Sequence, residues 1–127
     1  MRIHVSEIRS HRADIAIVKF ESPLGGATAQ WAGTKPDIGA LYEVELEVPG
    51  LLTWGSDIVE TLARESIYEE GGRICLVGCV QSLGDDGVAA IQVGSDIVLV
   101  ETVGAPSAVP RRVLICVPEI KLFDIDL

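Results

Sequence analysis

The chain has 127 residues, 48% of them hydrophobic, and a formal net charge of −9 at pH 7. This length predicts one domain, spanning residues 1–127, and the apolar content supports a buried core and excludes a disordered chain. The apolar runs span only a few residues, and none follows the charges near the N-terminus. Neither a transmembrane helix nor a secretory signal is therefore predicted, and we expect a cytoplasmic protein without a membrane partner.

Acidic residues are concentrated in the later part of the chain. Residues 1–35 contain five Lys and Arg against three Asp and Glu, whereas residues 36–127 contain five against sixteen. Such an acidic surface repels the phosphates of nucleic acids and attracts basic partners. The simpler interpretation is that the charge only keeps a hydrophobic domain in solution.

The N-terminal part of the chain is predicted to hold a short strand or arm over residues 1–5 and a strand over residues 13–20. Residues 21–37 lack any periodicity and are rich in Gly and Pro, which predicts a loop. A loop of this length is uncommon in a compact domain and is often functional. Trp31 lies in its middle, either as a ring folded back over the end of a barrel or as an exposed aromatic anchor for a partner.

Residues 39–48 show the clearest alternation in the sequence and predict a strand with one buried face. The side chains expected to face the core are Tyr42, Val44, Leu46 and Val48. The opposite face carries three carboxylates, about 6.6–6.8 Å apart along the strand, from Glu43, Glu45 and Glu47. These carboxylates form either a solvated face that deters edge-to-edge pairing or a docking stripe for a basic partner.

A short helix is predicted over residues 58–67, because Ser56 or Asp57 supplies an N-cap just before it. The sequence Gly-Ser-Asp-Ile-Val occurs at residues 55–59 and again at residues 94–98. A Gly-Ser-Asp turn that leads into a β-branched run accounts for both copies. If both copies begin strands, the predicted helix is wrong.

Three consecutive antiparallel strands are predicted over Arg73–Leu83, Val88–Val93 and residues 97–102, because turn residues separate these apolar runs. Both faces of the first run are apolar, which is typical of a strand covered on both sides. Gly78 in its middle indicates a bend or bulge where the sheet curls. Residues 111–117 and 120–125 supply the last two strands.

This arrangement of strands, from Arg73 to the C-terminus, resembles an OB-fold. The resemblance implies an all-β protein, with room for one short helix, built as a small OB-like Greek-key barrel with an N-terminal strand extension. Residues 103–110 depart from the pattern, because they are too short and too rich in Pro for the helix that OB-folds often carry there. The family binds single-stranded nucleic acids or oligosaccharides, but this half of the chain is acidic and has Phe123 as its only aromatic residue.

Three cysteines, Cys75, Cys79 and Cys116, lie within apolar strand patterns. Cys75 and Cys79 would be about 13 Å apart on one extended strand, too far to pair with each other. One of them could face Cys116 on a neighbouring strand, but the odd number and the lack of a secretory signal argue against a disulfide framework. We expect small buried hydrophobic side chains instead.

The sequence carries no catalytic motif. Phosphate-binding glycine loops, nucleophile elbows, HExxH and CxxC are all missing, and the adjacent pair Asp85 and Asp86 is typical of a hairpin turn rather than of a calcium site. We therefore expect no enzyme, no catalytic residues, no metal and no cofactor.

A small acidic domain without catalytic motifs resembles bacterial immunity proteins in size and charge. The resemblance implies a non-enzymatic inhibitor that neutralises a basic toxin, such as a nuclease, by placing carboxylates where phosphates would bind. The expected partner-binding residues are Glu43, Glu45, Glu47, Asp57, Glu60, Glu69, Glu70, Asp85, Asp86 and Trp31. The alternatives are an OB-type ligand or single-strand nucleic-acid binder, and a self-assembling structural subunit that forms a homo-oligomer.

Overall fold

A computed structural model describes residues 1–12 and 15–125, with side chains except those of residues 10–12. The described chain is all-β and contains no helix, and so no helix long and apolar enough to cross a membrane. Its first strands are β1 (Arg2–Arg12), β2 (Ile15–Ser22), β3 (Gly25–Ala32) and β4 (Leu41–Glu47). The strand predicted over residues 13–20 thus corresponds to β2, and its first two residues lie outside the described residues.

The later strands are shorter on average and follow one another closely. They are β5 (Leu51–Thr53), β6 (Ile58–Glu60), β7 (Ser66–Glu70), β8 (Arg73–Leu83), β9 (Val88–Val93), β10 (Asp96–Val103), β11 (Arg112–Val117) and β12 (Lys121–Asp124). The strands β8, β9 and β10 form the predicted antiparallel meander, with bounds within one residue of those expected.

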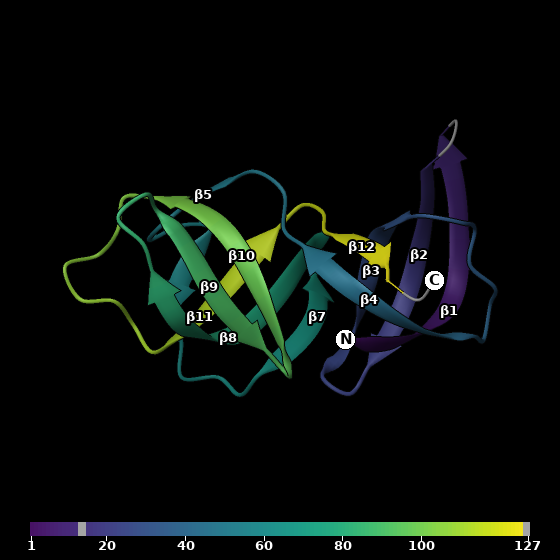
Figure 1. Cartoon of the computed structure of the whole chain (residues 1–127), viewed down its shortest axis with the longest axis horizontal. Helices are drawn as coiled ribbons and strands as arrows, with labels where there is room; N and C mark the ends of the chain where they lie inside the picture. The colour runs from purple at the N-terminus through teal and green to yellow at the C-terminus, as the bar shows by residue number, and fades with distance from the viewer. Residues whose placement is uncertain (13–14, 126–127) are drawn as a thin grey trace.

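Five strands close into a barrel. β1 pairs with β2 and β4, β2 pairs with β3, and β12 joins β3 to β4, so that the ring is complete. Figure 1 shows β12, in yellow, lying beside β3 and β4 among the purple and blue N-terminal strands. The last strand of the chain therefore closes a barrel that the first four strands begin.

The remaining strands form a second lobe beside the barrel (Figure 1). The order β7-β8-β9-β10-β5 runs across this lobe, and β11 pairs with the other edge of β8 and with β6. The β8 strand has three neighbours because β7 pairs with its residues 73–77, β9 pairs with residues 79–83, and β11 pairs with residues 74–79. The β8–β9 ladder has a register shift between Val80 and Ser82. The two lobes connect through a parallel bridge between Gly25 of β3 and Ile67 of β7.

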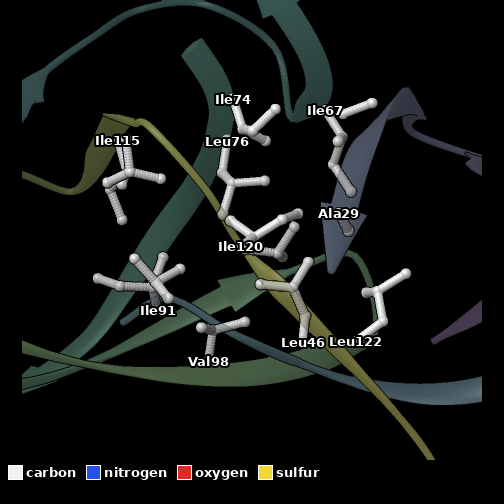
Figure 2. Packing of buried hydrophobic residues seen from close by; sticks show 14 of the residues in the cluster. Ala29, Leu46, Ile67, Ile74, Leu76, Ile91, Val98, Ile115, Ile120 and Leu122 are labelled. Atoms are coloured by element: carbon white, nitrogen blue, oxygen red, sulfur yellow. The ribbon is translucent and has the colours of Figure 1, made fainter. Parts of the chain in front are cut away.

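One aliphatic core runs through both lobes. Figure 2 shows Ile120 between side chains of the barrel and those of the second lobe. The barrel contributes Ala29, Leu46 and Leu122, and the second lobe contributes Ile67, Ile74, Leu76, Ile91, Val98 and Ile115. These β-branched and leucine side chains suit a closely packed interior between sheets.

The prediction of an all-β protein with a small closed barrel is confirmed, but the barrel is formed by other strands than expected. The meander from Arg73 onward builds the second lobe, and β1–β4 with β12 build the closed ring. The pairing of β12 with β3 joins residues some ninety positions apart in the chain, as in the pair of Lys121 and Gln30. Such long-range pairing is set by the whole fold and leaves no local mark on the sequence.

Two local predictions are wrong. Residues 58–67 form β6 and the start of β7 instead of a helix. Both copies of Gly-Ser-Asp-Ile-Val begin in a turn and lead into a strand. Residues 21–37 are mostly not a loop, because β2 ends at Ser22 and β3 follows after a tight turn. The alternation of β3 was overlooked because its inward side chains at Ala27 and Ala29 are small and the strand begins with two glycines, which are typical of loops.

The prediction of unpaired cysteines also needs correction. Cys75 of β8 and Cys116 of β11 are cross-strand neighbours and form a disulfide, whereas Cys79 is free. The two strands place the Cα atoms 4.3 Å apart. Sequence alone does not reveal that β8 and β11 are neighbours in this register, and an odd number of cysteines favoured the opposite conclusion.

Candidate binding groove

The β10 strand presents apolar side chains on both of its faces. Val98, Val100 and Thr102 point into the core and are almost completely buried. Ile97 and Leu99 point outward and are 54% and 63% exposed. Exposed large aliphatic side chains cost solvation free energy, so a row of them marks a candidate contact surface.

A groove of about 660 Å³ separates β10 from the barrel strands β4 and β12. Its β10 wall includes Ile97 and Leu99, and its barrel wall includes Phe123 and Ile125, which are 37% and 47% exposed. Figure 1 shows β4 and β10 on either side of the junction between the lobes, with the N-terminus near the start of β10. The groove therefore lies where the two lobes meet.

The N-terminal ammonium group occupies one end of this groove. It forms ion pairs with Asp96 and, at 3.8 Å, with Glu43, and it donates a hydrogen bond to the carbonyl oxygen of Val44 at 2.8 Å. Glu43 also accepts a hydrogen bond from Arg2 Nε at 3.0 Å. Cations of the protein itself thus already neutralise Glu43 and Asp96.

Glu45 and Glu47 differ from Glu43 in their surroundings. Both are exposed on β4 and line the groove, and no Lys, Arg or His side chain lines it among the described residues. Lys121 is opposite Glu47 in the β12–β4 ladder but does not line the groove. The predicted carboxylate stripe therefore divides into one neutralised member and two members that line a groove whose β10 wall is apolar.

The predicted acids of the second lobe do not gather at this groove. Asp57 accepts a hydrogen bond from the Thr53 amide at 2.8 Å, and it lies 3.9 Å from Arg73. Glu60 shares a shallow pocket with Arg111 and Arg112. Asp57 thus holds a turn, and Glu60 lies near basic side chains.

The other four acids lie at strand ends and turns. Glu69 accepts a hydrogen bond from the Thr28 amide at 2.8 Å, and Glu70 is opposite Arg73 in the β7–β8 ladder. Asp86 accepts a hydrogen bond from the Val88 amide at 3.0 Å in the turn before β9, and Asp85 is exposed beside it. Local structure explains Asp86, Glu69 and Glu70 without a partner.

Trp31 belongs to the core. It lies on β3, is 5% exposed, and donates a hydrogen bond from Nε1 to the carbonyl oxygen of Thr34 at 2.7 Å. Its ring meets the ring of Tyr42 edge to face, with centroids 4.9 Å apart. The alternative of an exposed aromatic anchor therefore does not fit its position.

The sequence analysis missed the apolar wall of the groove. Ile97 and Leu99 lie in the continuous apolar run IVLV at residues 97–100, so alternation could not distinguish its inner from its outer face. The apolarity of the run is itself the signal, because a strand with only one buried face normally carries polar residues on the other. Asp96 was assigned to the preceding turn.

No group of three or more His, Cys, Asp or Glu that could hold a metal ion occurs in the described part of the chain. The groove offers aliphatic and aromatic side chains, the Ser95 hydroxyl, strand backbone, and the carboxylates of Glu45 and Glu47, which form no ion pair with the described residues. Groups of these kinds can contact and orient a bound partner. Searches of protein-family models, curated proteins and solved structures found nothing that matches this chain.

Proposed function

We propose that this protein is a non-enzymatic binding module that holds a basic protein in the groove between β4 and β10. The observation that carries the proposal is the combination of exposed Glu45 and Glu47 with the exposed apolar side chains of Ile97 and Leu99, in a groove that no basic side chain of the described residues lines. Apolar contact supplies affinity, and the carboxylates select a cationic partner.

The charge of the whole chain supports the same partner class. A net charge of −9 attracts a basic protein over distances of about one Debye length, ~8–10 Å at physiological salt, and speeds its association. An OB-type role in binding single-stranded nucleic acid has no comparable support, because the carboxylates of the groove would repel phosphates.

We propose further that binding inhibits the partner, in the manner of an immunity protein. An enzyme that cleaves nucleic acid carries a cationic surface that binds phosphates. Carboxylates such as those of Glu45 and Glu47 can occupy that surface in place of the phosphates. The inhibitor needs no catalytic group of its own for this role.

Charge reversal in the groove tests the proposal. The Glu45→Lys/Glu47→Lys variant should recover less of a basic protein than the wild type in a pull-down from cells of the source organism, by at least about tenfold. Wild-type capture should fall as the salt concentration rises. Glu43 is left unchanged, because its replacement would disturb the ion pairs at the N-terminus.

The matched control is Asp85→Lys/Glu60→Lys, which changes the net charge by the same amount at two exposed sites that do not line the groove. This control should retain most of the capture. Equal losses in both variants would show that only the total charge matters, and unchanged capture by the groove variant would contradict the proposal.

A self-assembling subunit is the second candidate, and the exposed apolar face of β10 is the observation that favours it. Two copies joined there would also bring their groove carboxylates together, which opposes assembly. A wild-type protein that elutes as a dimer at about 0.15 M salt, and captures no other protein, would support this candidate over the basic partner.

A further inference from the structure

The β10 strand has an edge that is only partly used. β9 pairs with β10 from Asp96 to Glu101 along one edge. On the other edge β5 pairs only with residues 101–103, and no described strand pairs with residues 96–100 there. The unused stretch faces the groove, since Ser95, Asp96, Ile97 and Leu99 line it.

The hairpin geometry shows which backbone groups are free. Gly94 and Ser95 form a two-residue turn, so Val93 and Asp96 are the pair that closes the β9–β10 hairpin through hydrogen bonds. Hydrogen-bonded and non-hydrogen-bonded pairs alternate in an antiparallel ladder. The N–H and C=O groups of Ile97 and Leu99 therefore point away from β9, toward the groove.

We infer that the partner contributes an extended segment that adds to this edge as a strand, through hydrogen bonds with the backbone of Ile97 and Leu99. This inference rests on the proposed function and specifies how the partner is held. Addition of a strand to an exposed edge takes its affinity from main-chain hydrogen bonds and its specificity from side-chain contacts.

The groove also indicates the chemistry of the segment. Its aliphatic side chains would lie beside Ile97 and Leu99, and its Lys or Arg side chains beside Glu45 and Glu47. An alternating basic and apolar segment has this arrangement, because side chains along a strand alternate in direction. A second copy of β10 would instead bring its own Asp96 and Glu101 close to the same two residues of the first copy, and all of these side chains are negatively charged.

A defined peptide tests the inference on the full-length protein. The probe is acetyl-Lys-Val-Lys-Val-Lys-Val-Lys-amide, added to the ¹⁵N-labelled protein at low salt, with amide exchange followed by NMR. In the free protein the Ile97 and Leu99 amides should exchange faster than those of Val98 and Val100, which the β9 ladder protects. The peptide should slow the exchange of Ile97 and Leu99 by about tenfold or more.

The control peptide has N-methyl groups on its valine amides, so it keeps every charge but loses one edge of donors. It should bind about tenfold more weakly than the parent peptide. Equal binding of the two peptides, or no binding of the parent peptide, would overturn the inference.

Two variants test the protein side of the contact. Leu99→Pro removes a backbone donor that the β9 ladder does not use, and proline is tolerated at such an edge position. It should lose peptide binding by about tenfold, whereas Leu99→Ala, which keeps the donor, should lose about threefold or less. If Leu99→Pro does not fold, as judged by its thermal unfolding, the N-methylated peptide still decides the question.

The outcomes separate this inference from the proposed function. Binding that survives in Leu99→Pro but is lost in Glu45→Lys/Glu47→Lys would overturn strand addition and leave the acidic binding module intact. Binding that survives charge reversal would contradict both. A wild-type dimer that Leu99→Pro converts to a monomer would assign the edge to a second copy of the chain and overturn the basic segment.

Discussion

Cys75 and Cys116 join two strands that are distant in the sequence but adjacent in the second lobe. Their disulfide closes a sequence separation of 41 residues that includes β9 and β10. Cross-linking a loop of this size restricts the unfolded chain and is expected to stabilise the fold by about 4 kcal/mol. The bond also bears on the compartment in which the protein works, since disulfides persist mainly in oxidising environments and are rare in the cytosol.

Reduction should therefore lower the free energy of unfolding by about 4 kcal/mol, measured by urea denaturation with and without dithiothreitol. The Cys75→Ala/Cys116→Ala variant should have lower stability that no longer responds to the reductant. Cys79→Ser is the matched control and should keep the full response, because Cys79 is free. A wild-type protein that dithiothreitol leaves unchanged would contradict the structural role of the bond.

At the scale of the elements, the contact between β3 and β7 depends on Gly25. This residue has a φ of +123°, and a Cβ atom added there would overlap the backbone carbonyl of Ile67. The same two segments share the hydrogen bond from the Ile67 amide to the carbonyl oxygen of Leu24, at 2.9 Å. Gly25 thus allows the barrel and the second lobe to approach closely.

Gly25→Ala should destabilise the protein by about 3 kcal/mol or more, since it combines strain at positive φ with displacement of β7. Gly50→Ala is the control, because Gly50 also has positive φ, +89°, but has no atom within 4 Å of the added Cβ. Gly50→Ala should lower the free energy of unfolding by only about 1–2 kcal/mol. Urea denaturation measures the free energy of unfolding of both variants. Equal losses would show that the overlap with β7 adds nothing to the cost of Gly25→Ala.

The elements that the sequence predicted well are those with strong local signals. β4 was predicted from its alternation, and Val44, Leu46 and Val48 are indeed buried. β8, β9 and β10 were predicted because turn residues separate them. β3 was missed because Gly and Ala carry little alternation, and β6 was mistaken for a helix because Asp57 resembles an N-cap while its carboxylate instead accepts the Thr53 amide.

The groove could not be predicted in the same way. It exists because β10 of the second lobe lies opposite β4 of the barrel, and because β12 returns to close the barrel, so that all three contribute to its lining. Each of these facts depends on pairing between distant segments. The sequence supplied the carboxylates of Glu45 and Glu47, and the fold supplied the apolar wall that makes them a candidate site.

At the scale of the whole molecule, two lobes are built around one core. The β12 strand lies in the barrel and follows directly on β11 of the second lobe, and Ile120 between them is completely buried. The core cluster includes side chains of both lobes without a break. Shared buried contacts couple the stability of the two lobes, so we expect them to unfold as one cooperative unit.

The two tryptophans provide a direct measurement, because each lobe contains one. Trp31 lies in β3 of the barrel, and Trp54 directly follows β5 in the second lobe. Fluorescence of Trp54→Phe reports on the barrel, and fluorescence of Trp31→Phe reports on the second lobe. Within each variant, the urea midpoint by fluorescence should coincide with the midpoint by circular dichroism, which follows all strands at once. A fluorescence transition that precedes the loss of strand signal would show that one lobe unfolds first. The groove, whose walls come from both lobes, would then be lost together with the first lobe to unfold, and a bound partner would stabilise that lobe.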